Sequence, residues 1–164
     1  METLTEQSVC TACGFNLIGF RPKRCRFCGA TSDHFISAAA CAATYHVQSE
    51  QVSDRVTQLK SVPQLGYEHT AYRIDTGSVA IWIDCPCVFD QSVMPMNYIL
   101  FTHNDFLGAS NLYREYFKAE VWIHQQDALH PNSRFFSFDR CFTDAFQLAG
   151  IEAIVVGGHS PGFT

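Results

Sequence analysis

The chain has 164 residues, of which 47% are hydrophobic and 16% are charged, and its formal net charge at pH 7 is −5. A chain of this length buries about 70% of its unfolded surface, so it can form a core without disulfides and is not a disordered tail. The negative charge argues against a nucleic-acid binder, and no apolar run approaches the roughly 18 residues of a membrane helix. The acidic N-terminal segment 1–7 lacks the apolar region of a signal peptide, which indicates a cytoplasmic protein.

Two Cys-x-x-Cys-Gly turns dominate the first segment of the chain. Each turn presents two thiolates from one tight loop, and its glycine permits the backbone conformation that aims amide groups at sulfur. A segment this short cannot close its own core, so we predict that a metal ion holds it together. The predicted ligands are Cys10, Cys13, Cys25 and Cys28, with Phe15, Phe20, Phe27 and Phe35 expected to shield the sulfur atoms.

The stretch 22–30, followed by Phe35, resembles the second knuckle of rubredoxin-like domains and equally the zinc ribbons built on the same plan. The resemblance implies iron or zinc: iron would mean one-electron transfer, and zinc a structural or docking module. Residues 1–40 are therefore predicted to be a rubredoxin-like four-cysteine domain. Its basic residues form either a docking surface for a redox partner or an acidic protein, or a merely solvated loop; they are Arg21, Lys23, Arg24 and Arg26.

Residues 41–54 are predicted to be a connector. The small-residue run 37–43 is compatible with one or two helical turns or with an extended segment, and Cys41 is expected to be a buried thiol. The polar stretch 48–54 carries no strong pattern.

Strand and helix patterns alternate through residues 55–164, which predicts a layered α/β domain. The expected strands are 71–75 and 79–84, joined as a hairpin, then 97–102, 120–124, 142–148 and 152–156. The expected helices are 110–118, with Ser110 as its N-cap, and a short one from 125.

Two histidines and a carboxylate stand where predicted strands end. His103 follows the apolar run 99–102, and Asp105 lies two residues further on. His159 follows the apolar stretch 154–156 and two glycines. Because open α/β sheets place ligands at strand ends, the three side chains can converge on one zinc or iron ion. Considered singly, a histidine after a strand is more often a hydrogen-bonded loop residue, and Asp105 could simply cap a turn.

The order of these motifs resembles the metallo-β-lactamase superfamily. The matching stretches are Val79–Pro86, Phe101–Asp105, Gly108–Leu112, Ala119–Ala128 and Gly158–Gly162. The resemblance implies an αββα fold in which His103, Asp105 and His159 hold one metal ion. It also implies that Asp84 supports the ligand loop, that Asp105 is the catalytic candidate if the protein is active, and that His124 and Asp127 are structural.

The chain departs from the superfamily signature, Thr-His-x-His-x-Asp-His, at three positions. Asp105 stands at the second histidine, Leu107 at the aspartate and Gly108 at the last histidine, so the second metal site of the superfamily has lost two ligands. The resemblance also stops at the end of the chain, where family members continue with further strands, so the domain is expected to be truncated and incomplete.

Several residues receive no role in chemistry. Cys85 and Cys87 are expected to be two packed thiols, and together with Cys41 and Cys141 they make four predicted core thiols. No partner is identified for the remaining histidines, His34, His46, His69 and His130.

Two functions follow from this interpretation. The first is a metallo-hydrolase-like or oxidoreductase-like protein with iron or zinc at the four cysteines and at most one degenerate metallo-β-lactamase site. The second is a non-catalytic binding or regulatory protein with a structural zinc ribbon and a vestigial scaffold. Neither involves a membrane or nucleic acid, and both leave oligomerisation open.

Overall fold

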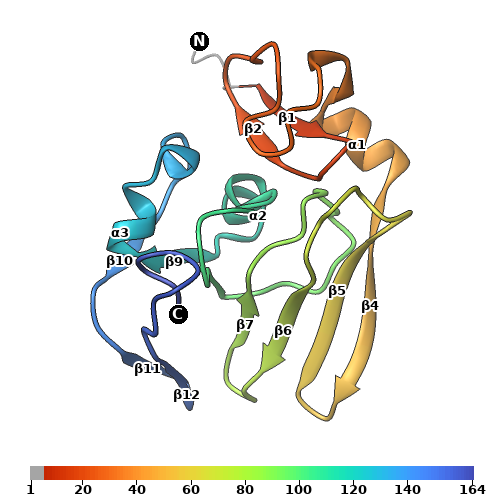
Figure 1. Ribbon diagram of the computed structural model, residues 1–164. Helices are drawn as coiled ribbons and strands as arrows, with labels where there is room; N and C mark the ends of the chain where they lie inside the picture. The colour runs from red at the N-terminus through yellow and green to blue at the C-terminus, as the bar shows by residue number, and fades with distance from the viewer. Residues whose placement is uncertain (1–5) are drawn as a thin grey trace.

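Three short strands form a small antiparallel sheet near the N-terminus of the computed structural model, which describes residues 6–164. The strands are β1 (Gln7–Cys10), β2 (Asn16–Ile18) and β3 (Phe35–Ser37), in the order β2-β1-β3. Residues 1–5, part of the acidic N-terminal segment, lie outside the described residues. In Figure 1 this sheet lies at the top, above one end of the larger sheet.

A seven-stranded sheet forms the centre of the molecule, in the order β10-β9-β8-β7-β6-β5-β4. Its first four strands along the chain pair antiparallel, whereas β7, β8, β9 and β10 pair parallel. The antiparallel strands are β4 (His46–Ser53), β5 (Val56–Val62), β6 (Ala71–Asp75) and β7 (Ala80–Ile83). The parallel part adds β8 (Tyr98–Leu100), β9 (Glu120–His124) and β10 (Arg140–Phe142).

The predicted connector, residues 41–54, contains most of helix α1 (Ala38–Thr44) and all of β4. The hydroxyl of Ser37 caps α1 by accepting a hydrogen bond from the Ala40 amide. β4 is the edge of the large sheet, and all but one of its side chains are exposed. The sequence predicts the end of a strand at 45–47, where β4 begins, but the exposed residues 48–53 lack the apolar alternation that identifies strands in a sequence, which explains why the rest of β4 was not predicted.

Helix α2 (Ser110–Phe117) covers one face of the large sheet. Trp82, Ile99 and Val121 are neighbours in register on three adjacent strands and are fully buried. The ring of Tyr113 on α2 packs edge to face on Trp82, with centroids 4.9 Å apart. The prediction of Ser110 as the N-cap of this helix was wrong: Ala109 occupies the N-cap position, and the Ser110 hydroxyl is buried inside the first turn.

A two-stranded sheet covers the opposite face. It consists of β11 (Phe146–Leu148) and β12 (Ile151–Ala153), and it packs on Ile83, Leu100 and Trp122. The predicted strand 142–148 is therefore two strands, because β10 ends at Phe142 and the chain turns before β11. Ala149 and Gly150, both with positive φ, make the turn that joins the hairpin. The short helix α3 (Gln125–Ala128) directly follows β9 as predicted.

One hydrophobic core runs through both regions of the molecule. It joins Val9, Cys10 and Phe35 of the small sheet to Trp82 and Ile99 of the large sheet. The α/β class and the layered arrangement are as the sequence predicted. Within residues 6–164, no helix is long and apolar enough to cross a membrane.

Candidate metal centres

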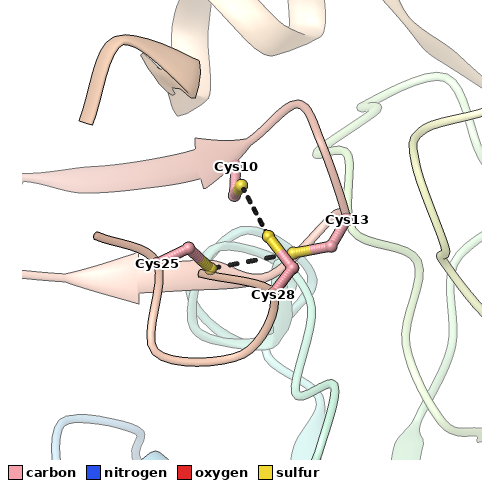
Figure 2. Close-up of side chains that lie close together, drawn as sticks. All are labelled: Cys10, Cys13, Cys25 and Cys28. Atoms are coloured by element: carbon pink, nitrogen blue, oxygen red, sulfur yellow. Dashed lines mark hydrogen bonds between the residues drawn. The ribbon is translucent and has the colours of Figure 1, made fainter. Parts of the chain in front are cut away.

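The four predicted cysteine ligands converge at one end of β1. Cys10 is the last residue of β1, and Cys13 follows in the turn. The second pair lies on the loop between β2 and β3, and Figure 2 shows all four sulfur atoms pointing toward one another. The two turns have matching geometry: the amide of Gly14 donates to the Cys10 carbonyl and the amide of Gly29 to the Cys25 carbonyl, both glycines having positive φ.

The spacing of the sulfur atoms fits a tetrahedral ion. The Sγ atoms of Cys10 and Cys28 are 3.8 Å apart, as are those of Cys13 and Cys25, and all four lie within 4.8 Å of one another. A tetrahedron with metal–sulfur bonds of about 2.3 Å has edges of about 3.8 Å. Both separations are far longer than the roughly 2.05 Å of a disulfide bond.

The thiols of this cluster differ in pKa because they differ in burial and in hydrogen bonding. Burial raises the pKa of Cys10 to about 11 and raises the pKa of Cys13 well above its usual range. Burial also opposes ionisation of Cys28, but hydrogen bonds from the Ala30 amide and the other thiols outweigh it and lower the pKa of Cys28. The thiol of Cys28 is therefore more acidic than those of Cys10 and Cys13, and any protons on the thiols must leave when a cation binds.

The surroundings of this cluster match the prediction in part. Phe15 and Phe35 are buried beside it, but Phe20 is 89% exposed and shields nothing, because it lies in the turn after β2. Two of the four basic residues have partners: Arg21 donates to Glu6 and Ser8, and Arg24 donates to the Gly29 carbonyl.

The second predicted group also comes together. His103 and Asp105 lie on the loop after β8, and His159 lies on the segment after β12. Their ligand atoms are within 4.8 Å of one another, and His159 Nε2 is 2.9 Å from Asp105 Oδ2. The side chains of His159 and Asp105 are 54% and 34% exposed, so water reaches this group. An accessible set of three ligands is typical of a catalytic site rather than of a closed structural one.

Asp84 supports the ligand loop through Thr102. Its carboxylate accepts hydrogen bonds from the Thr102 amide and hydroxyl, at 2.9 and 2.7 Å. Because that hydroxyl donates to Asp84, it can only accept at its 2.7 Å contact with His103 Nδ1. The proton of His103 then lies on Nδ1, which leaves Nε2 free to bind a metal ion. Asp84 itself has a left-handed backbone with φ 59°, a conformation that aspartate tolerates better than most residues.

Asp127 joins the two ligand loops. This carboxylate is 1% exposed and accepts from Asn104 Nδ2 at 3.0 Å and from Ser160 Oγ at 2.8 Å. Asn104 lies between the candidate ligands His103 and Asp105, and Ser160 follows His159. His124, the other residue expected to be structural, caps α3 by accepting from the Gln126 amide.

His69, to which the sequence assigned no partner, lies beside this group. Its ring centroid is 5.3 Å from that of His103, and its Nε2 is 3.9 Å from Asp84 Oδ2. Burial is the main cause that lowers the pKa of His69. The residue precedes β6 on an irregular segment, with no strand or turn motif that could have placed it at the site.

Two of the three positions that depart from the signature, Leu107 and Gly108, offer no further ligand. Leu107 is buried in the main core. Gly108 has φ +55°, and a Cβ atom there would lie 2.5 Å from the carbonyl oxygens of Cys85 and Pro86. A histidine cannot occupy this position with the present backbone.

The other thiols follow the prediction except one. Cys41, Cys85 and Cys87 are buried, and burial raises the pKa of each. Cys141 is exposed, because β10 is the edge of the large sheet, so its prediction as a core thiol was wrong.

Comparison with known proteins identifies the fold. A beta-lactamase from Chitinophaga pinensis matches with 18% identity over 72% of this chain and 55% of its own, at a TM-score of 0.52. The metallo-beta-lactamase from Cronobacter sakazakii matches with 19% identity over 77% and 58%, also at 0.52. A class B3 di-zinc metallo-beta-lactamase from an Alaskan soil metagenome matches with 16% identity over 72% and 55%, at 0.50.

These matches show that the chain has the metallo-β-lactamase fold. The chain spans about 55–58% of the length of these structures. No protein-family model and no curated protein matches the sequence.

Proposed function

We propose that this chain is a metal-binding protein of the metallo-β-lactamase fold with one metal ion at its four cysteines and at most one at His103, Asp105 and His159. The observation that carries the proposal is the pair of 3.8 Å sulfur separations, which equal the edge of a tetrahedral metal–thiolate site. All four sulfur atoms also lie within 4.8 Å of one another, so they surround one common centre and do not form two separate pairs.

The donor set of the first site suits zinc or iron, since both take four thiolates in a tetrahedron. The surface position of Cys28 beside three buried cysteines leaves one sulfur atom near solvent. That exposure would suit electron exchange if the metal is iron. Zinc at the same site would stabilise the fold without redox chemistry.

The second site supports a hydrolase-like or oxidoreductase-like activity. A divalent ion there would supply a Lewis acid and a water of lowered pKa. The residues of the chain would orient it: Asp84 and Thr102 hold the proton of His103 on Nδ1, and Asp105 contributes the carboxylate ligand. With Leu107 and Gly108 at the other signature positions, we propose a site for one ion and not two.

A non-catalytic role is the second candidate, and the crowding around Gly108 favours it. In that case the four-cysteine region is a structural zinc module. The exposed basic residues Lys23 and Arg26 would then face an acidic protein partner.

Metal analysis combined with a visible spectrum tests both candidates. We expect two equivalents of metal in the wild type, one in the His103→Ala, His159→Ala double variant, and a colourless protein with zinc or a red one with ferric iron. Equal metal content in the wild type and the double variant would exclude the second site. Loss of neither equivalent in a Cys25→Ser, Cys28→Ser variant would exclude the first.

A further inference from the structure

A line of aromatic contacts connects the two candidate metal centres. Phe27 lies between the ligands Cys25 and Cys28, and its ring packs edge to face on Phe106 with centroids 4.5 Å apart. Phe106 directly follows the ligand Asp105. Its ring is 5.2 Å from that of His69, which in turn lies 5.3 Å from His103.

The backbone of the first cysteine turn makes a parallel connection. The amide of Tyr67 donates to the Cys13 carbonyl at 3.2 Å. Gly66 lies so close that a Cβ atom there would be 2.5 Å from the Cα of Cys13. The segment that carries His69 therefore rests directly on the first turn, just as the His103–Asp105 loop rests on the second.

The position of Phe27 depends on the cysteine turn that carries it. Phe27 is 43% exposed, so packing from its surroundings restrains it only partly. Its neighbours in the chain, Cys25 and Cys28, become fixed when a metal ion replaces the protons between the thiols. Phe106, by contrast, is 6% exposed and sits in the ligand loop. A fixed Phe27 thus presents a rigid ring to the loop that holds the second set of ligands.

We propose that metal binding at the four cysteines positions the His103, Asp105 and His159 site, with Phe27 as the positioning residue that acts through Phe106. The inference rests on the proposed function, since it requires that both sites bind metal. It adds that the cysteine module tightens metal binding at the second site. Because binding couplings are reciprocal, metal at the second site must strengthen retention at the cysteines by the same factor.

The test is the zinc affinity of the second site, measured by chelator competition on protein whose cysteine site is already loaded. We expect Phe27→Ala to weaken zinc binding at the second site about three- to tenfold, in line with the contribution of an aromatic pair to an equilibrium constant. Phe20→Ala is the matched control, because Phe20 belongs to the same module and is 89% exposed. The second-site zinc affinity of Phe20→Ala should stay within about twofold of the wild type. Phe27→Tyr, which keeps an aromatic ring at this position, should keep most of the wild-type affinity.

Two further measurements separate coupling from a general loss of stability. In a double-mutant cycle of Phe27→Ala and Phe106→Leu, the two effects on zinc affinity should be less than additive, because both changes break the same contact. Zinc should leave the cysteines more slowly when the second site is filled in the wild type, and this difference should shrink in Phe27→Ala. Equal second-site affinities for Phe27→Ala and Phe20→Ala would overturn the inference.

The design also distinguishes this inference from the proposal beneath it. If the wild type and the His103→Ala, His159→Ala variant bind equal zinc, the proposed second site fails. If the wild type binds the second zinc and Phe27→Ala binds it equally well, only the coupling fails.

Discussion

Replacing Asp127 by alanine tests how the second candidate site is built. The carboxylate is 1% exposed and accepts hydrogen bonds from Asn104 at 3.0 Å and from Ser160 at 2.8 Å. These two donors lie on the loops that carry His103 and His159. Without the carboxylate, both donors lose their acceptor and the two loops lose their shared anchor.

The expected cost follows from those two contacts. A hydrogen bond to a charged group contributes about 1.5–3 kcal/mol, and water entering the space left by the side chain recovers part of this. We therefore expect Asp127→Ala to lower the free energy of unfolding by about 2–4 kcal/mol. Asp127→Asn should cost about 1 kcal/mol or less, because its carbonyl can accept from Asn104 while its amide donates to a reversed Ser160 hydroxyl.

Urea unfolding followed by tryptophan fluorescence gives the stability, and zinc competition gives the affinity of the second site. Asp54→Ala is the control, since Asp54 is exposed in the turn between β4 and β5. Asp127→Ala should also weaken zinc binding at the second site, whereas Asp127→Asn should not. The reasoning would be refuted if Asp127→Ala matched Asp54→Ala in stability, or if the asparagine variant lost as much as the alanine variant.

Three other predictions concern the thiols, a crowded glycine and a buried acid. Because the pKa of Cys10 is raised to about 11, its thiol is protonated at neutral pH and must lose that proton when zinc binds. As the pH is lowered from 8 to 6, the apparent zinc affinity of the four-cysteine site should fall by up to about tenfold per pH unit for each proton that zinc displaces. A zinc affinity that does not change with pH in chelator competition would contradict this. Gly108→Ala should destabilise the protein by about 1–3 kcal/mol more than Gly77→Ala, because both glycines have positive φ but only Gly108 is crowded; equal urea midpoints would count against the clash. Burial raises the pKa of Glu68, so the folded state binds the proton of this carboxyl more tightly than the unfolded state does. The free energy of unfolding should therefore fall as the pH rises from 4.5 through the folded-state pKa, and Glu68→Gln should remove that fall. If the free energy of unfolding of the two proteins changes with pH in parallel, Glu68 is not the source of the fall.

The parts of the fold that the sequence predicted are those with a strong local signal. The strands β6 to β9 and helix α2 carry continuous apolar runs or helical spacing, and they appear within about two residues of the predicted bounds. The edge strand β4 carries no such signal beyond Val47, because its residues 48–53 are all exposed. The sequence predicted one strand over 142–148, where the structure has the end of β10 and all of β11. The turn between them is short and is flanked by Phe142 and Phe146, so the hydrophobic pattern does not mark it.

The site shows the same division. The spacing of the cysteines and the strand-end positions of His103 and His159 were sufficient to name the two groups of candidate ligands whose side chains the structure brings together. His69 was missed because its proximity to His103 depends on the packing of a segment that has no pattern of its own. The exposure of Phe20 and Cys141 likewise depends on which turn or sheet edge each occupies.

The sequence by itself determined the chemistry of this protein: two Cys-x-x-Cys-Gly turns, two histidines and an aspartate at strand ends, and an α/β order of elements. These features are local, because ligand spacing within a turn and alternation along a strand need only neighbouring residues. Only the tertiary structure decided that a buried aspartate links the two loops that carry the candidate ligands and that the ring of Phe27 packs on Phe106, next to Asp105. Such contacts join residues far apart in the chain, and their geometry is set by the packing of a shared core, which no single segment encodes.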